Sequence, residues 1–296
     1  MDIYYTNYAI KNKNVCEKSD WVLNYTNKSF DFAFIGNSRV INMVDIKTIE
    51  DKTGKKGINL GLTGANYAEN YLVLDQFIKA GNKIKNLVVQ IDMHSLKSST
   101  LPYPFHNYNY MHLLGDTTVN NIYKDNNPYY KVLLWRYIPF ARYMEFSNRY
   151  VFYKMLKGGF ECKNNAELDS TKGTEQLFYK EFTPPQNQYA YWSVSPLDKK
   201  YLDKLITFSN QKNINIIFYT APMYYKYFPY QLKLKEILDD FKTNVSGKGI
   251  SYFNFSNTDN FLCTDLKNYN DQIHMNMDGV RKFSSVISDS LIKSLK

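Results

Sequence analysis

The sequence predicts an α/β protein in which a doubly wound sheet of five parallel strands lies between two layers of helices. Two observations predict this class. Short apolar runs that end at turn residues alternate along the chain with longer amphipathic stretches, and such alternation is typical of parallel sheets covered on both faces. The length of 296 residues also suits one domain of this class, because a chain of that size buries about three quarters of its unfolded surface.

Each expected strand is a short run rich in apolar or β-branched residues. These runs cover residues 32–36, 58–60, 84–92, 214–222 and 250–255. The expected helices cover residues 40–46, 67–79, 196–213, 232–245 and 277–295. Local signals support the boundaries, since Gly81 stops the second helix and Pro196 with acidic Asp198 opens the third. Ligands of such a sheet bind beyond the carboxyl ends of the strands.

A long segment, residues 97–188, separates the third expected strand from the fourth. Connections in such folds usually need only a few residues. We therefore expect residues 1–296 to form a single domain, with 97–188 as an inserted cap or helical subdomain, and 135–156 as a helix within it. A cap over the carboxyl edge should place some of its aromatic residues near Ser38: Tyr103, Phe105, Tyr108, Tyr110 and Trp135.

The composition says little about specific partners. The net charge is +9 and the pI is near 9.1, but the lysines are spread along the chain and no nucleic-acid motif occurs, so we expect no nucleic-acid partner. A weak attraction to an anionic glycan or a membrane surface is consistent with the charge. The 27 tyrosines fit either the codon usage of an AT-rich genome or a groove that binds sugars. Nothing in the sequence indicates the oligomeric state.

The cysteines and the apolar runs bear on location. Cys16, Cys162 and Cys263 are far apart and form no CxxC pair, so free thiols in a reducing compartment are expected. No run of about 18 apolar residues occurs, and the first residues lack a secretory pattern. The sequence as it stands is expected to be cytoplasmic; a chain trimmed of an anchor would look the same, which leaves association with the cell envelope open.

The stretch "DFAFIGNSRV" places Ser38 in a turn between an expected strand and an expected helix. A serine at that point is either a helix N-cap or a nucleophile. Asp271 and His274 stand immediately before the last expected helix. Because the carboxyl ends of parallel strands share one edge, this DxxH pair should lie near Ser38. A base and a group that orients it are what a nucleophilic serine needs.

Three segments together resemble the SGNH (GDSL-like) hydrolase superfamily: "FIGNSRV", "INLGLTGANY" and "DQIHMNMDG". The segment "IIFYTAPM" is similar to bacterial members of the branch that modifies cell-surface polymers by acyl transfer. The resemblance implies that Ser38 is the nucleophile, His274 the base and Asp271 the acid of a catalytic triad. It also implies that the amides of Ser38 and Gly64 form the oxyanion hole, that the substrate is a carbohydrate, and that the reaction needs no metal or cofactor.

The sequence departs from this pattern at two places. Asn37 stands where an acidic residue is usual, and "VVQIDMHSL" lacks the asparagine that donates a third hydrogen bond to the oxyanion. Asp92 and His94 lie in that segment as possible site members, although an ionised Asp92 cannot donate a hydrogen bond. Another group supplies the donor, or two amides suffice, or the enzyme is slower. Arg39 either contacts an anionic group of the substrate or forms a surface ion pair.

The sequence therefore predicts an O-acyl esterase or O-acyltransferase that acts on a bacterial surface polysaccharide or its precursor. The alternative is a catalytically silent carbohydrate-binding module on the same fold, favoured by the missing asparagine, since a fold does not fix a function. A nucleotide-binding protein is disfavoured, because no glycine-rich phosphate-binding motif follows the first expected strand.

Overall fold

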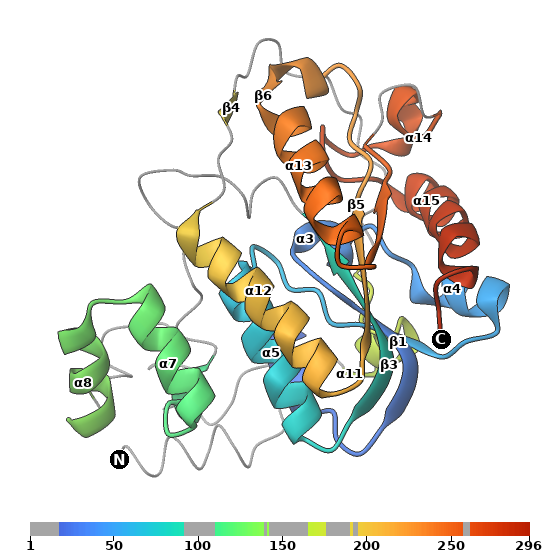
Figure 1. Ribbon diagram of the computed structural model, residues 1–296. Coiled ribbons are helices and arrows are strands. Elements are labelled where there is room, and N and C mark those ends of the chain that lie inside the picture. The colour runs from blue at the N-terminus through green and yellow to red at the C-terminus, as the bar shows by residue number, and fades with distance from the viewer. Residues whose placement is uncertain are drawn as a thin grey trace, which may run out of the picture.

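The computed structural model describes residues 18–91, 110–138, 141, 165–175, 190–191, 195–256 and 261–296. Its main sheet has five strands, all parallel, in the order β2-β1-β3-β5-β7 (Figure 1). Their bounds are β1 Ser29–Ile35, β2 Gly57–Asn59, β3 Lys83–Gln90, β5 Asn215–Thr220 and β7 Ser251–Asn254. In chain order this is 2-1-3-4-5, the order of flavodoxin-like sheets, and the predicted fold class is confirmed.

Helices cover both faces of the sheet, as the alternating pattern predicts. Side chains of β1 alternate between the faces: Phe32 and Phe34 pack with α4 Ile46–Thr53 and α15 Met277–Ile292, while Ala33 packs with the opposite layer. The opposite layer contains α2 Lys18–Asn24, α5 Tyr67–Lys79, α12 Pro196–Gln211 and α13 Leu234–Ser246. Figure 1 shows α5 and α12 side by side, and α4 beside α15.

The remaining elements are short. They are α3 Ser38–Ile41, η2 Met111–Leu113, α7 Thr117–Asn126, α8 Tyr129–Tyr137, α11 Asn165–Ser170, η3 Phe228–Tyr230, α14 Phe261–Thr264 and η4 Leu266–Asn268, with a two-stranded parallel pair of β4 Ala190–Tyr191 and β6 Gln231–Leu232. None of the helices within these described stretches is long and apolar enough to cross a bilayer.

The expected helix over residues 40–46 is wrong. The chain instead forms α3, a turn and then α4. The physical reason is the buried side chain of Asn59, whose amide donates hydrogen bonds to the backbone carbonyls of Val40 and Val44. Thr174 also donates to the Val44 carbonyl. The side chains thus satisfy carbonyls that a continuous helix would have paired with its own amides.

The described part of the insertion forms an extra layer beside α5 and α12. Lys79 of α5 bonds to Asp116 at the start of α7, and Lys200 of α12 bonds to Asp125 near the end of α7. Helix α8, which packs on α7, runs from Tyr129 to Tyr137, and Ile138 after it is extended. The expected helix over 135–156 is therefore wrong, because the helix begins earlier and ends at Tyr137; residues 139–140 and 142–156 lie outside the described residues.

Two of the aromatic residues expected near Ser38 are core residues instead. The Tyr110 hydroxyl donates to Glu69 of α5, and the Trp135 ring packs edge-on against Tyr123. Because their exposed fractions are 0% and 1%, neither ring can line a substrate groove. Tyr103, Phe105 and Tyr108 lie outside the described residues. A cap formed by the rest of the insertion stays a prediction.

One segment of the insertion returns to the sheet. The Lys172 carbonyl accepts a hydrogen bond from the amide of Asn59 in the edge strand β2, and covering an edge in this way protects it from pairing with other chains. The Glu175 amide then donates to the carbonyl of Ile41 at the end of α3. The insertion therefore passes beside the helix that carries Ser38.

Candidate active site

The loops at the carboxyl edge of the sheet are joined by backbone hydrogen bonds. The Leu62 amide in the loop after β2 donates to the Gly36 carbonyl after β1. The Tyr224 amide in the loop after β5 donates to the Gln272 carbonyl before α15. These bonds bring segments from distant parts of the sequence to one edge, as the parallel topology predicts.

Ser38 is the first residue of α3, and its neighbour Asn37 is the N-cap. The Asn37 side chain accepts a hydrogen bond from the Arg39 amide, so the N-cap interpretation of Ser38 is wrong. Asn37, a possible site member from its place beside Ser38, is 6% exposed, and its side chain has this structural task. Gly36 permits the tight turn, because a Cβ there would lie 2.8 Å from the Gln90 side-chain oxygen.

The Ser38 hydroxyl instead belongs to a chain of three side chains. Ser38 Oγ lies 2.9 Å from His274 Nε2, and His274 Nδ1 lies 2.8 Å from Asp271 Oδ2. An ionised carboxylate can only accept hydrogen bonds, so Nδ1 carries a proton. In the neutral ring, Nε2 is then the acceptor and the serine hydroxyl donates to it. This is the tautomer in which an imidazole can take the serine proton.

Asp271 is held by the backbone of its own loop. Its Oδ1 atom accepts hydrogen bonds from the amides of Ile273 and His274, at 2.9 and 2.8 Å. Burial alone would raise the pKa of Asp271, but the hydrogen bond and charge of His274, together with these two amides, outweigh it and lower the pKa. The carboxylate therefore remains ionised at neutral pH, where it can orient the ring.

The loop that carries the pair is a tight hairpin before α15. Tyr269 and Met275 form an antiparallel bridge, and the Asn270 amide donates to the His274 carbonyl. Asn276 then caps α15, accepting from the amides of Asp278 and Gly279. The His274 side chain is 19% exposed, so the imidazole is held on several sides and still reaches solvent.

The backbone N–H groups of Ser38 and Gly64 belong to two loops at this edge of the sheet. Among the residues that the structure describes, neither Ser38 N–H nor Gly64 N–H donates a hydrogen bond. Gly64 has a φ of 69°, a left-handed conformation that favours glycine. Its loop is fastened to the serine turn by the bond between Leu62 and Gly36. The two groups are suited to hold a developing negative charge on an oxygen.

Arg39 has neither of the roles expected for it. Its side chain is fully buried, and Nη2 donates to the carbonyls of Ala221 and Pro222 at 2.8 and 2.6 Å. It is therefore neither a surface ion pair nor a group that meets substrate. It connects α3 to the loop after β5. That loop is hydrogen-bonded to Gln272, which lies between Asp271 and His274 in the sequence.

The third oxyanion donor is not located. Asp92 and His94, the possible site members after β3, lie outside the described residues. The sequence analysis also missed Asn59. Its side-chain oxygen accepts hydrogen bonds from the Gly61 amide and from Lys18 Nζ, and its side-chain nitrogen donates to the turn between α3 and α4. The signal was present, because a polar residue stood inside the apolar run 58–60.

Comparisons with known proteins do not assign this site. No protein-family model matches the chain, and no curated protein gives a significant sequence match. The sheet order is consistent with flavodoxin-like and SGNH folds. The function therefore has to be argued from the chemistry of the site itself.

Proposed function

We propose that the protein is a serine-dependent O-acyl esterase or O-acyltransferase that acts on a carbohydrate. The hydrogen-bonded chain from Ser38 through His274 to Asp271 carries the proposal. A nucleophile, a base within reach and a group that orients the base are the parts that covalent acyl transfer requires. They occur together at the edge of the sheet where ligands of this fold class bind.

The proposed reaction uses this geometry at each step. His274 Nε2 takes the hydroxyl proton as Ser38 Oγ attacks the ester carbonyl carbon, and the amides of Ser38 and Gly64 hold the resulting oxyanion. Collapse of this intermediate breaks the bond to the alcohol, which leaves with the proton from His274, and the acyl group stays on Ser38. Water or an acceptor hydroxyl then attacks with His274 again as base, which releases the serine. Asp271 stays ionised and stabilises the imidazolium.

The substrate class rests on the SGNH resemblance. The segments around Ser38, Gly64 and His274 resemble those of bacterial enzymes that modify surface polysaccharides, and the sheet order is consistent with that superfamily. A bacterial surface polysaccharide or its precursor is therefore the proposed acyl donor or acceptor. A cytoplasmic location stays a prediction.

One departure favours a second candidate function. The segment "VVQIDMHSL" lacks the asparagine expected to donate to the oxyanion, and loss of one such donor typically lowers turnover by about 10²–10³-fold. A catalytically silent carbohydrate-binding module would tolerate that loss. The triad hydrogen bonds favour the enzyme, because a binding module has no need of them.

A covalent label tests the proposal most directly. A serine-directed phosphonate should add its mass once, at Ser38, and purified protein should release nitrophenol from a short-chain nitrophenyl ester. Ser38→Ala should abolish both results. The matched control is Ser290→Ala on α15, a half-exposed serine outside the site, which should change neither.

Failure on the artificial ester leads to a second measurement. Release of acetate from, or acetyl transfer to, a panel of bacterial polysaccharides would then be measured. Inactivity on the whole panel, with saccharide binding that Ser38→Ala leaves unchanged, would replace the enzyme by the binding module.

A further inference from the structure

The outermost helix of the insertion, α8, exposes an unusual amount of apolar surface. Five large hydrophobic residues between positions 129 and 138 are exposed by 46–68%: Tyr129, Tyr130, Leu134, Tyr137 and Ile138. Among the described residues, only two other large hydrophobic residues are that exposed: Phe261 and Ile292. Single exposed apolar residues are normal, whereas a group of them marks an interaction surface.

The exposed residues form one face of the helix. Tyr130, Leu134 and Tyr137 are spaced i, i+4 and i+7, which places them on the same side. Val132 and Trp135, on another side, are buried against the insertion. We call the first three residues the α8 face. Figure 1 shows α8 beside α7, at the outer margin of the molecule.

The charges around this face have one sign. Residues 129–138 contain Lys131 and Arg136 and no acidic residue. The Arg136 guanidinium lies over the Tyr137 ring and the Lys124 ammonium lies over the Tyr129 ring, at 5.5 and 5.7 Å from the ring centres. The basic groups and the tyrosines thus form a single surface.

The acidic residues of α7 are directed elsewhere. Asp116 bonds to Lys79 of α5, and Asp125 bonds to Lys200 and Tyr201 of α12. Both carboxylates therefore bind the insertion to the rest of the protein and do not face the exposed side of α8.

The sequence continues this composition beyond α8. Residues 129–157 contain six basic residues and one acidic residue, Glu145, a net charge of +5 out of +9 for the chain. They also contain ten aromatic residues. More than half of the net charge is therefore concentrated in about a tenth of the sequence, together with apolar side chains.

We propose that the α8 face binds the surface of an anionic lipid bilayer. Tyrosine is suited to the headgroup region because its ring is apolar and its hydroxyl is polar, and basic residues are attracted to anionic headgroups. Leu134 and Ile138 favour lipid over an anionic glycan, because apolar side chains gain free energy at the acyl boundary and none from a hydrated polyanion. The proposal concerns a surface apart from Ser38 and does not depend on the acyl-transfer chemistry.

Vesicle flotation tests the proposal. The full chain should float with vesicles that contain phosphatidylglycerol and remain unbound with pure phosphatidylcholine, and added salt should weaken the binding. Combined Tyr130→Ser, Leu134→Ser and Tyr137→Ser should weaken it about tenfold or more. Arg136→Glu should weaken it about tenfold or more as well, because it reverses a charge at the surface.

Two controls match these variants. Phe261→Ser with Ile292→Ser removes exposed apolar residues elsewhere, and Lys235→Glu reverses an exposed charge on α13; each should bind vesicles like the parent. Circular dichroism and the phosphonate label would show that every variant is folded. Because the α8 face is exposed, its substitution should leave both unchanged.

Three results would overturn the proposal. One is binding that is equal on neutral and anionic vesicles. Another is binding to soluble dextran sulfate that Arg136→Glu abolishes and the triple serine variant keeps, which identifies an anionic glycan site. The third is a dimer in sedimentation that the triple variant dissociates, which identifies a second copy of the chain as the partner.

Discussion

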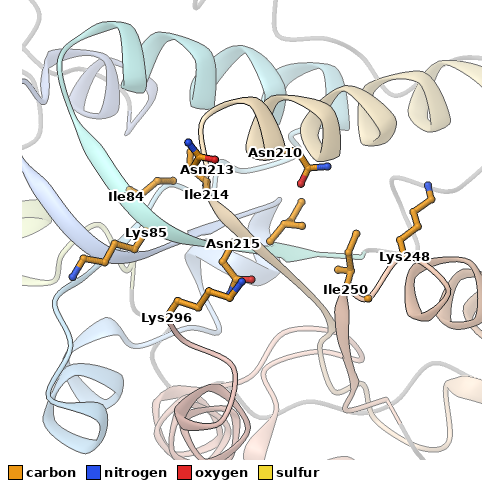
Figure 2. Close-up of a pocket in the computed structure, with 11 residues that line it drawn as sticks. Ile84, Lys85, Asn210, Asn213, Ile214, Asn215, Lys248, Ile250 and Lys296 are labelled. Carbon is orange, nitrogen blue, oxygen red and sulfur yellow. The ribbon is translucent and has the colours of Figure 1, made fainter.

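The two edges of the same sheet are both polar, yet they differ in what their polar groups do. The carboxyl edge holds Ser38, His274 and Asp271 in hydrogen-bond contact. The amino edge holds a hollow, a cavity of about 610 Å³ (Figure 2). Three lysines, three asparagines, four isoleucines and a glycine line it.

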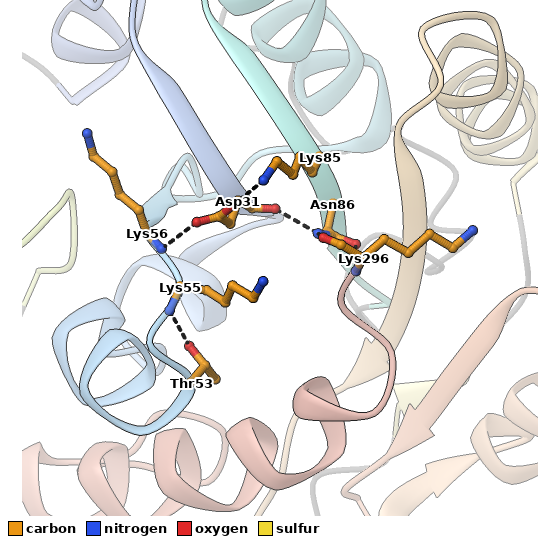
Figure 3. A network of polar contacts seen from close by, with 7 residues as sticks. All are labelled: Asp31, Thr53, Lys55, Lys56, Lys85, Asn86 and Lys296. Carbon is orange, nitrogen blue, oxygen red and sulfur yellow. Dashed lines mark hydrogen bonds and ion pairs between the residues drawn. The ribbon is translucent and has the colours of Figure 1, made fainter.

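The amino-edge cavity is lined by few kinds of side chain. No carboxylate, imidazole, thiol or hydroxyl side chain occurs among the described residues that line it. It therefore lacks the hydrogen-bonded pair of hydroxyl and imidazole found at the carboxyl edge, and one of its lysines, Lys85, bonds to Asp31 (Figure 3). Volume alone does not identify a reactive site in this molecule.

One asparagine of the amino edge, Asn86, has a structural task. Asn86 is fully buried in β3, and its amide donates to the carbonyls of Asp31 and Lys296 while its oxygen accepts from Asn215 and the Lys296 amide. Figure 3 shows this residue between the strand and the last residue of the chain. The edge thus joins distant segments, whereas the carboxyl edge leaves Ser38 and two amides available to a ligand.

The largest expected effect separates the two edges by activity. His274→Ala should lower kcat/KM by about 10⁴-fold or more, because the serine and its base act as a unit, and Asp271→Asn should cost less. Lys248→Ala, which changes the amino-edge cavity, should leave kcat/KM unchanged. Ester hydrolysis at saturating and limiting substrate measures both. A comparable loss in Lys248→Ala would contradict the proposal, because it would place the reactive site at the amino edge.

The next effect concerns Arg39 as a positioning residue. Arg39→Met leaves the carbonyls of Ala221 and Pro222 without their donor and loosens the link between α3 and the loop of His274. A displacement of about 1 Å can cost about 10²-fold in rate, so kcat should fall while KM changes little. Arg39→Lys, which keeps the charge and one donor nitrogen, should recover part of kcat at equal stability in urea.

If Arg39→Lys recovers no activity, the positioning role of Arg39 is contradicted. If Arg39→Lys and Arg39→Met lose activity only in proportion to the unfolded fraction seen in urea, the residue stabilises the fold without orienting the triad. The label at Ser38 would then return fully when the variants are assayed under stabilising conditions.

At the amino edge, the expected effect is on stability alone. Asn86→Ala removes a buried side chain that satisfies four backbone and side-chain partners, which should lower the free energy of unfolding by about 1–3 kcal/mol. Turnover of the folded fraction should stay at the parent value. Asn210→Ala, at an exposed asparagine that lines the amino-edge cavity, is the control and should stay within about 0.5 kcal/mol. A turnover change in Asn86→Ala at full folding would show that the edges are coupled.

The sequence predicted the fold where one local pattern decides it. All five strands are apolar runs between turn residues, and α5 occupies the expected residues 67–79. The expected nearness of Ser38 to His274 followed from a rule of topology, because both stand after strands of a parallel sheet. Such rules need only the order of the elements and no detail of side-chain packing.

The parts that failed depend on contacts between distant residues. The break between α3 and α4 is set by the Asn59 amide, and the burial of Arg39 by carbonyls after β5. Neither partner is visible in a local window of sequence. Tyr110 and Trp135 show the same limit. The sequence of an insertion does not reveal whether an aromatic residue lines a groove or packs in a core.

The smallest expected effect compares two carboxylates, one at each edge. Asp31, like Asp271, has a pKa below the ordinary value: the hydrogen bonds from the Lys85 ammonium and the Lys56 amide lower it, against a smaller opposing effect of burial. A lowered folded-state pKa adds stability above the unfolded pKa of about 3.9, and this stability is lost as the pH falls through the folded value. Since the Lys85 side chain is 64% exposed, Lys85→Met should cost less than about 1 kcal/mol at pH 7.

The pH dependence of that difference decides its origin. In acid, Asp31 is protonated in both proteins, so the difference in urea stability between parent and Lys85→Met should vanish there, and high salt at neutral pH should also shrink it. A difference that persists in acid would come from packing of the lysine stem instead of its charge. Hydrolysis by Lys85→Met should match the parent at neutral pH, because Asp31 joins strands, whereas Asp271 contacts His274. A change in the pH profile of hydrolysis would show instead that the charge at the amino edge reaches the triad.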